Sequence, residues 1–302
     1  MKESQGHIPV LLEEVIQYLD PKPGEVYLDV TLGGGGHTRA ILTRQPECKI
    51  IGMDWDKSVL ATTGAELEQE FPGRFMSLYG NFAKIQEHLV KAKIKKVDGI
   101  LADFGTSQMQ IRNTPGFSVY QDSLLDMRFS PGMFYHTAHG VVNRFTEDHL
   151  AQIFYDYGQE SRGRKIARAI VEQRKKKKFE TTKELADLIM DMTPGSYHKI
   201  HPATKVFQAL RIFVNEELEN ITCFLRHAPN VLNNGGRLVC ISFHSLEDRI
   251  VKQFFKDKSS KNPSISPRFE MATKGACMAS PEELQRNRSA RSARLRAGIL
   301  RI

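Results

Sequence analysis

Cysteine is scarce in this chain of 302 residues and follows no motif spacing. The four cysteines, Cys48, Cys223, Cys240 and Cys277, are scattered along the sequence. No two of them form a C-x-x-C motif, which is the spacing typical of zinc ligands and redox centres. We therefore predict no disulfide framework and no metal site, and we expect a reducing compartment.

Long apolar runs are also missing. No segment reaches the roughly 18 consecutive apolar residues that a membrane-spanning helix needs. Residues 1–7 show neither the apolar core of a signal peptide nor an Arg/Ser-rich amphipathic leader. These absences exclude the usual membrane and export signals, so we expect no membrane partner and a cytoplasmic location.

Acidic residues are outnumbered by basic ones. The chain has 43 Lys and Arg against 35 Asp and Glu, which gives a formal net charge of +8. Such a balance favours a polyanionic partner, and nucleic acid comes first. Many soluble proteins carry a similar charge, so the charge alone does not identify the partner, and sequence motifs are needed to infer it.

A run of glycines between a predicted strand and a predicted helix is the central motif. Apolar residues alternate over Val26–Val30, which predicts a short strand. Gly33, Gly34, Gly35 and Gly36 follow, and a helix is expected from His37 onward. A strand, a glycine turn and a helix N-terminus form the nucleotide-binding edge of a doubly wound α/β sheet.

The spacing within this motif distinguishes between nucleotides. A dinucleotide fingerprint counted from Gly33 needs a glycine at its sixth position, where this chain has Thr38. Instead, Asp29 is followed by glycines four and six residues later. This pattern resembles motif I of the S-adenosylmethionine (SAM) methyltransferases. An ordinary glycine-rich loop is the alternative.

Two later residues fit the same type of site. Asp54 ends the next predicted strand, about 20 residues past the glycines, where an acid accepts hydrogen bonds from ribose hydroxyls. Asp56 is a possible substitute, although a helix-capping role suits it better. Phe82 follows a third strand, where it either stacks on adenine or is a core aromatic.

The remaining chain suggests a split domain. A fourth strand ends at Asp103, whereas residues 108–200 show helical patterns and no clear strand. A Thr-x-x-Glu capping box at Thr181 opens one of these helices. One long helix is expected over 203–232, and a fifth strand over 237–241 leads to His244. We predict a discontinuous domain, 1–107 and 201–302, interrupted by a helical substrate-recognition domain, 108–200.

Two basic stretches leave alternatives open. Residues 174–178 read Arg-Lys-Lys-Lys-Lys, which is either a solvated helix end or a phosphate contact. The arginines within 287–296 belong either to a flexible basic tail or to an RNA-facing edge.

Several long segments together resemble one family, the bacterial RsmH (MraW) methyltransferases. The matching segments span most of the chain: His7–Val15, Asp29–His37, Leu124–Arg128, His201–Ile212 and Ile241–Lys252. The resemblance implies an α/β fold of class I SAM-dependent methyltransferases, a Rossmann-like doubly wound sheet with an inserted all-helical subdomain. It also implies methylation of the exocyclic N4 of a cytidine in the decoding region of small-subunit (16S) ribosomal RNA.

The resemblance also assigns cofactor contacts. We expect SAM to lie against the glycine turn Gly33–Gly36 and against a further set of side chains: His37, Asp54, Phe82, Asp103 and Gln110. The roles of His37 and Gln110 come from the resemblance alone. The chain departs from the family at residues 104–109 and 115–123, and Trp55 replaces a usual arginine. Most of these departures lie on the acceptor side and bear on the RNA target rather than on the cofactor.

For the reaction itself we predict three candidate catalytic residues, none of them a metal ligand. Asp103 and Ser107 follow the fourth strand, and His244 follows the fifth. The Asn/Asp-Pro-Pro-Tyr/Phe loop of many amino-methyltransferases is missing, so these assignments are a hypothesis. His244 is equally suited to a structural hydrogen bond or a substrate contact.

The expected partner is the small ribosomal subunit with its rRNA, and the protein is expected to be a monomer or a homodimer. Two rival interpretations remain. The first is a SAM-dependent methyltransferase of another RNA, of a protein or of a small molecule. The second is a non-catalytic RNA-binding assembly factor.

Overall fold

The computed structural model describes residues 8–105, 114–193, 201–259 and 267–302, which form two compact units. The first unit contains Met1–Gly105 and Leu218–Ile302, and the second contains Thr106–Glu217. Sequence analysis placed the return to the first unit at residue 201. The structure places it at Leu218, because the helix over 204–214 buries Val206, Phe207 and Leu210 in the core of the second unit.

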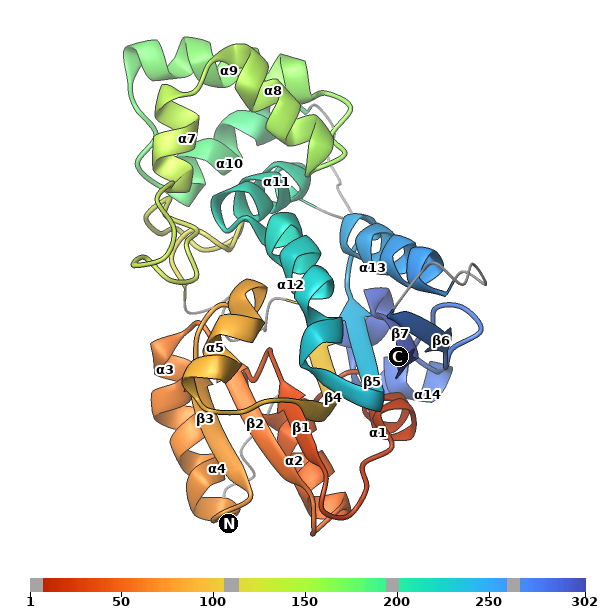
Figure 1. The fold of residues 1–302 in the computed structure, drawn as a ribbon. Helices are drawn as coiled ribbons and strands as arrows, with labels where there is room; N and C mark the ends of the chain where they lie inside the picture. The colour runs from red at the N-terminus through yellow and green to blue at the C-terminus, as the bar shows by residue number, and fades with distance from the viewer. Residues whose placement is uncertain (1–7, 106–113, 194–200, 260–266) are drawn as a thin grey trace. The chain divides into compact units, whose positions relative to one another are not determined.

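The first unit contains one mixed sheet (Figure 1). Its strands within the described residues are β1 (Val26–Asp29), β2 (Lys49–Asp54), β3 (Phe75–Tyr79), β4 (Val97–Asp103), β5 (Leu232–Ser242), β6 (Arg268–Met271) and β7 (Arg294–Arg301). They are ordered β3-β2-β1-β4-β5-β7-β6. Strands β1 to β5 pair in parallel, and β7 pairs antiparallel with both β5 and β6. The predicted α/β fold class, with a mostly parallel Rossmann-like sheet, is confirmed.

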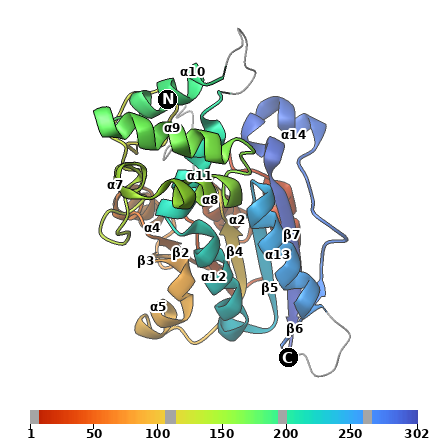
Figure 2. The same ribbon diagram turned by 90° about the horizontal axis from the view of Figure 1, so that it is seen from above.

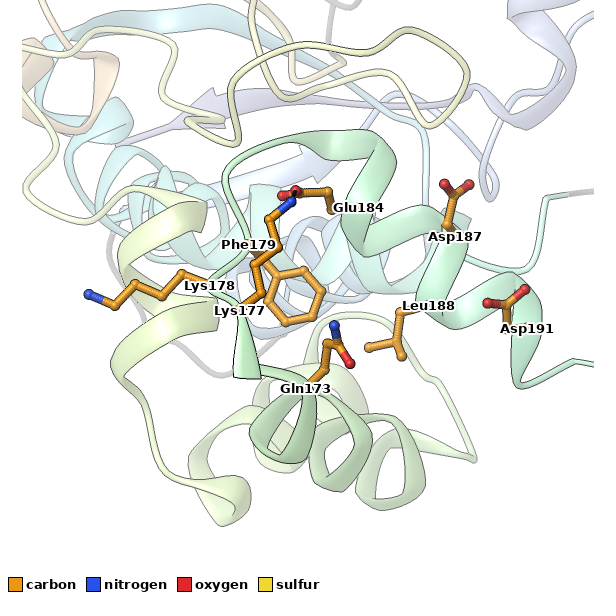
Figure 3. A pocket seen from close by; sticks show the side chains of 8 residues that line it. All are labelled: Gln173, Lys177, Lys178, Phe179, Glu184, Asp187, Leu188 and Asp191. Carbon is orange, nitrogen blue, oxygen red and sulfur yellow. Dashed lines mark hydrogen bonds and ion pairs between the residues drawn. The ribbon is translucent and has the colours of Figure 1, made fainter. Parts of the chain in front are cut away.

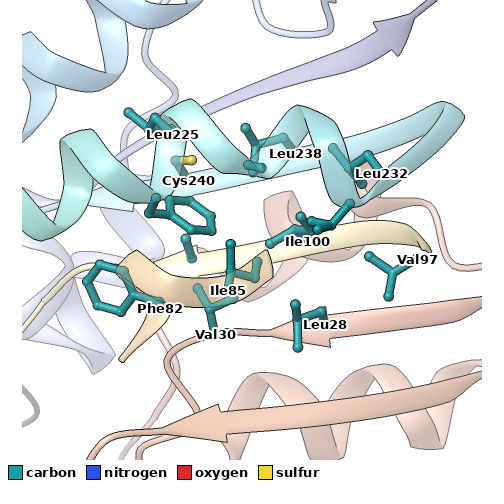
Figure 4. Close-up of a cluster of buried hydrophobic side chains, with 14 of the residues drawn as sticks. Leu28, Val30, Phe82, Ile85, Val97, Ile100, Leu225, Leu232, Leu238 and Cys240 are labelled. Carbon is teal, nitrogen blue, oxygen red and sulfur yellow. The ribbon is translucent and has the colours of Figure 1, made fainter. Parts of the chain in front are cut away.

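Helices cover both faces of this sheet (Figures 1 and 2). One buried cluster joins the sheet to α5 (Ile85–Lys91), α12 (Glu217–Val231) and α13 (Ser245–Lys258). Figure 4 shows its centre, where Ile85 and Leu225 meet Val30, Ile100 and Leu238 of the strands. The other cluster includes residues of α1 (Leu12–Leu19), α2 (Gly36–Arg44) and α4 (Ala65–Glu70). Strands buried on both faces are typical of parallel sheets, which explains their nearly continuous apolar sequences.

The carboxyl ends of β1, β2 and β4 therefore lie side by side. Asp29 ends β1, Asp54 ends β2 and Asp103 ends β4. Ligands of open α/β sheets bind outside these strand ends. The topology thus brings together three acids that are far apart in the sequence.

The second unit is helical in its described residues. Its helices are α7 (Ala138–Arg144), α8 (Glu147–Asp156), α9 (Gly163–Lys176), α10 (Thr182–Asp191) and α11 (Thr204–Val214). The predicted capping box is confirmed, since the Thr181 side chain accepts from the Glu184 N–H and the Glu184 carboxylate accepts from Thr181 N–H. No described helix of the chain is long and apolar enough to cross a membrane.

The single long helix predicted over 203–232 is wrong. The chain forms two helices there, because Glu216 takes a left-handed φ of 50°. The fully buried Asn215 side chain stabilises the break. It donates to the carbonyls of Met127 and Arg211 and accepts from the N–H of Phe129, at 2.7 to 2.9 Å. Two of these three hydrogen bonds join Asn215 to residues more than 80 positions away, which a local sequence pattern does not reveal.

The flexible-tail reading of 287–296 is also wrong. After the short helices α14 (Pro281–Arg286) and η3 (Arg288–Ser292), the chain enters the sheet as β7. Arg296 donates to both oxygens of the buried Asp248 carboxylate, at 2.8 and 3.2 Å, and Arg294 donates to one of them. Burial alone would raise the pKa of Asp248, but the two arginines hold it below its usual value.

Replacing Arg296 should therefore destabilise the fold. Arg296→Ala leaves a buried carboxylate with one remaining partner, and we expect a loss of about 3 kcal/mol in the free energy of unfolding. Arg291→Ala removes an exposed arginine of the same stretch and should change it by less than about 0.5 kcal/mol. Urea unfolding checks both, and equal effects would contradict the ion-pair role.

Candidate functional site

The glycine turn has a backbone that only glycine adopts without strain. Gly33 has a φ of 49° and Gly35 a φ of 70°. A Cβ atom on Gly35 would lie 2.7 Å from Cγ2 of Thr63, whereas one on Gly34 would meet no atom of the described residues within 4 Å. Since α2 begins at Gly36 without a side-chain cap, its first N–H groups remain available to a ligand. The turn is packed beneath Gly35 and open beside Gly34.

Asp54 closes this turn from the neighbouring strand. Its Oδ2 accepts the N–H of Gly33 and its Oδ1 the N–H of Asp56, both at 2.9 Å. Burial raises the pKa of Asp54 to about 6. Each carboxylate oxygen keeps a second lone pair, so Asp54 can shape the turn and still accept from a ligand hydroxyl. Asp56 caps α3 (Lys57–Val59) through the N–H of Ser58, as predicted.

Asp29 supports the site from within. Its Oδ2 accepts from the Thr38 hydroxyl at 2.8 Å, and its Oδ1 accepts from the Thr31 N–H at 3.1 Å. The Thr31 hydroxyl in turn accepts from the N–H of Asp103 at 2.7 Å. Burial raises the pKa of Asp29. Asp29 thus ties β1 to the start of α2, and Thr31 ties β1 to the end of β4.

Asp103 and His37 form the most polar part of the edge. Nδ1 of His37 lies 3.8 Å from Oδ2 of Asp103, and Nε2 of His37 lies 2.8 Å from the carbonyl oxygen of Val10. Burial raises the pKa of Asp103 to about 6, nearby Asp29 adds to the rise, and His37 opposes it. Oδ1 of Asp103 is buried and has no hydrogen-bond partner among the described residues. Such an atom requires an explanation, and a bound ligand provides one.

Phe82 lies in an aromatic cluster. Its ring centroid is 5.4 Å from that of Trp55, 5.8 Å from that of Phe104 and 5.8 Å from that of Phe224. Only 7% of Phe82 is exposed. The core role considered for this residue is therefore real, while adenine stacking stays a prediction.

His244 is explained by local structure. Its Nδ1 accepts the N–H of Glu247 at 3.4 Å, and its Nε2 lies 3.2 Å from Oε1 of the same residue. The other carboxylate oxygen of Glu247 accepts the N–H groups of Phe243 and His244. His244 is the N-cap of α13, and both ring nitrogens face Glu247. His244 therefore has a capping role, while its catalytic role stays a prediction, since its buried Nε2 has no hydrogen-bond partner among the described residues.

Two predicted site residues, Ser107 and Gln110, lie outside the described residues. Sequence reasoning also missed contributors, of which Thr38 and the Val10 carbonyl are the clearest. The hydroxyl of Thr38 gave a weak signal, since a buried acid such as Asp29 needs a donor. A backbone carbonyl such as that of Val10 gives no sequence signal at all.

The basic run at 174–178 is largely engaged within the second unit. Arg174 donates to the Val142 carbonyl at 2.7 Å, Lys175 pairs with Glu172, and Lys177 pairs with Glu184. Figure 3 shows a hollow of about 260 Å³ beside it, lined by lysines and acids together: Gln173, Lys177, Lys178, Phe179, Glu184, Asp187, Leu188 and Asp191. The mixed charge favours the solvated-surface alternative over a phosphate site.

The raised pKa of Asp103 predicts how stability depends on pH. An acid whose folded pKa is raised releases its proton more easily when unfolded, so stability falls as pH rises from about 4 to about 6. Asp103→Asn removes this term and should stabilise the ligand-free protein at pH 7 by up to about 3 kcal/mol. Thermal unfolding at pH 4 and pH 7 checks it; a variant with the same pH dependence as the original chain would contradict it.

The described residues fit a bound SAM molecule. The open space beside Gly34 and the free N–H groups of α2 suit its methionine carboxylate. The acceptors of Asp54 suit ribose hydroxyls. The unpartnered Oδ1 of Asp103 suits the positive charge of its ammonium or sulfonium, because a buried carboxylate is stabilised by a nearby cation.

Comparison with known proteins agrees with this geometry. The sequence profile of the MraW methylase family matches residues 4–299. Proteins named ribosomal RNA small subunit methyltransferase H are similar over nearly their full lengths. The protein of Carboxydothermus hydrogenoformans is 44% identical, and the match covers 97% of this chain and 97% of that protein. The protein of Ehrlichia chaffeensis is also 44% identical, and the match covers 98% of this chain and 100% of that protein. That of Endomicrobium trichonymphae is 45% identical, covering 96% of this chain and 97% of its own.

A profile match over almost the whole chain, together with relatives at this level of identity, identifies the family. The resemblance seen in the sequence is thereby confirmed, and with it the use of SAM. This chain belongs to the MraW methylase family of SAM-dependent methyltransferases.

Proposed function

We propose that the protein transfers a methyl group from SAM to the exocyclic N4 of a cytidine in the decoding region of small-subunit rRNA. The relatives named ribosomal RNA small subunit methyltransferase H support the rRNA substrate. The observation that carries the proposal is the buried, unpartnered Oδ1 of Asp103 at the same sheet edge as the glycine turn. An acceptor in this position is what an amine substrate needs.

The first task of the site is to hold the cofactor. When bound, SAM supplies a methyl group activated by the positive charge of its sulfonium. Gly33 to Gly36 would hold its methionine part near the N-terminus of α2, and Asp54 would accept from its ribose. Phe82 and Trp55 would contact its adenine. These contacts position the donor without a metal ion.

The second task is to orient the amine. The lone pair of the cytidine N4 is conjugated with the ring, so it does not point at an electrophile in the ground state. Oδ1 of Asp103 has two lone pairs, so it can face the positive charge of SAM and also accept one N4–H. That hydrogen bond would hold the amine while its nitrogen becomes tetrahedral, so that the lone pair leaves conjugation with the ring and faces the methyl carbon. Positioning of this kind supplies up to about 7–11 kcal/mol. Because the pKa of Asp103 is about 6, its carboxylate can also take the proton that the amine loses.

The third task, exposing the base, belongs to the RNA and to the second unit. Enzymes that act on a base edge bind unpaired or flipped nucleotides. The segment before α7 carries two neighbouring aromatic residues, Phe134 and Tyr135. Phe134 is buried, whereas 93% of Tyr135 is exposed. We assign the contact with an unpaired base to Tyr135.

The loop that carries Tyr135 is held in shape by Arg128. The guanidinium donates to Asp126 at 2.7 and 2.8 Å and to the carbonyls of Pro131 and Phe134 at 3.2 and 3.4 Å. A fixed loop presents an aromatic ring at a low entropic cost. The proposed partner is the small ribosomal subunit, and the protein is proposed to act in the cytoplasm as a monomer or homodimer.

Methyl transfer to small ribosomal subunits that lack the modification tests the function. Labelled SAM should yield N4-methylated cytidine at a single decoding-region position, identified by nucleoside analysis and mapping. Asp103→Ala should lower the transfer rate by about 10²-fold or more, because one positioned acceptor is lost. His244→Gln serves as a comparison and should retain most of the rate, provided that the fold is intact.

Other results would separate the rival functions. Transfer to another RNA, or to a protein, would contradict the proposed substrate and leave the cofactor chemistry in place. SAM binding without transfer to any subunit or RNA would indicate an assembly factor. A loss of less than tenfold in Asp103→Ala would overturn the role of its carboxylate.

Tyr135→Ala tests the base contact. Stacking of one base on an aromatic side chain is worth about 1–3 kcal/mol, so RNA affinity should fall by roughly 5- to 150-fold while SAM affinity stays unchanged. Tyr135→Phe should keep most of the affinity. Tyr155→Ala, a partly exposed tyrosine on α8, serves as the control. An unchanged RNA affinity in Tyr135→Ala would exclude the contact.

A further inference from the structure

The C-terminal part of the chain holds residues 8–11 near the cofactor edge. Oε1 of Glu283, on α14, accepts the N–H of Leu11 at 2.8 Å, across 272 positions of sequence. The side-chain amide of Asn287 donates to the carbonyl of Ile8 at 3.0 Å. Glu283 and Asn287 are both buried. Two buried polar side chains thus fix one short segment at both of its ends.

This segment needs such support. Leu11 has a φ of 52°, a left-handed conformation that is costly for a leucine. Leu11 is completely buried, and its N–H would be unsatisfied without an acceptor. The carboxylate of Glu283 satisfies that N–H, and it thereby stabilises a conformation that the local sequence does not favour.

The segment contacts a residue of the cofactor site, His37. Between its two fixed ends lies Val10, whose carbonyl is 2.8 Å from Nε2 of His37. A carbonyl can only accept a hydrogen bond, so Nε2 carries a proton. The ring is then oriented with Nδ1 toward Oδ2 of Asp103, at 3.8 Å. The opposite oxygen, Oδ1, has no hydrogen-bond partner in the part of the chain that the structure describes.

We infer that Glu283 is a positioning residue for the cofactor: through Leu11 and Val10 it fixes the orientation of His37, whose ring lies beside Oδ2 of Asp103 and leaves Oδ1 to a ligand. The inference rests on the proposed SAM site at this edge. It assigns to the short C-terminal helix α14, which contains none of the predicted site residues, a direct influence on SAM affinity.

A double-mutant cycle distinguishes positioning from simple stabilisation. Glu283→Ala should weaken SAM binding by about tenfold in the original chain. The same change should weaken it by less than about twofold when His37 is already replaced by Gln, because Glu283 acts on SAM through His37. Calorimetry with SAM alone gives the affinities. An equal loss in both backgrounds would overturn the inference and leave Glu283 a structural role.

Matched variants complete this test. Glu283→Gln keeps an acceptor oxygen and should stay within about threefold of the original affinity. Glu282→Ala removes a carboxylate from the same first turn of α14, where it is exposed, and should stay within about twofold. Asn287→Ala releases the other end of the segment and serves if Glu283→Ala does not fold. A Glu282→Ala loss as large as that of Glu283→Ala would contradict the inference.

The tautomer of His37 gives a readout that does not depend on SAM. The ¹⁵N chemical shifts of its ring should report a protonated Nε2 hydrogen-bonded to the Val10 carbonyl, and Glu283→Ala should alter them whereas Glu282→Ala should not. An original chain that does not bind SAM would refute the proposed function while this spectroscopic result still stands. Unaltered shifts in Glu283→Ala, together with normal SAM binding by the original chain, would refute the positioning role alone.

Discussion

Three carboxyl groups at one edge of the sheet, two of them buried and that of Asp103 partly buried, determine the character of this site. Asp29, Asp54 and Asp103 end three adjacent strands, and burial raises the pKa of each. Burying like charges together costs stability unless donors or cations compensate. The fold supplies N–H groups, two threonine hydroxyls and His37. One oxygen, Oδ1 of Asp103, is left without a partner among the described residues. A bound cationic cofactor would offset the remaining negative charge. The edge of the sheet that costs the ligand-free protein stability is therefore also the edge where the cofactor is expected to bind.

The ends of the first unit's sheet and its N-terminal segment are stabilised by the C-terminal part of the chain. Strand β7 pairs with β5, and its arginines neutralise Asp248 of α13. Helix α14 satisfies the backbone of Leu11 and Ile8. These contacts explain why the C-terminal arginines, which look like a soluble basic tail, are part of the fold. They also connect the last strand of the sheet to the residues that orient His37.

The second unit has its own core and its own polar supports. Asn215 and Arg128 each bind several backbone groups, and together they shape the segments around Met127 and Phe129 and the loop that carries Tyr135. Two lysines of its basic run, Lys175 and Lys177, by contrast, pair with neighbouring acids. Recognition of RNA by this unit would accordingly depend on shape and stacking more than on that run of charge, in keeping with specific recognition of unpaired RNA.

The sequence by itself determined the features that depend on neighbouring residues. Alternating apolar residues predicted β1 to β4, Thr181 and Glu184 predicted a capping box, and the spacing of Asp29, Gly33 and Asp54 predicted a nucleotide edge. Family motifs added His37 and Asp103. Each of these signals lies within a short stretch, where side-chain periodicity and capping chemistry act.

Tertiary structure alone decided the features that depend on distant partners. The break before α12 depends on hydrogen bonds from Asn215 to the backbone of Met127 and Phe129. Strand β7 forms because it pairs with β5 and because its arginines bind Asp248. His244 proved to be a cap because Glu247 turns back onto its ring. The Val10 carbonyl contacts His37 from a segment whose Leu11 N–H is bound by Glu283, 272 positions away. Such contacts depend on how the chain packs, and no local pattern encodes them.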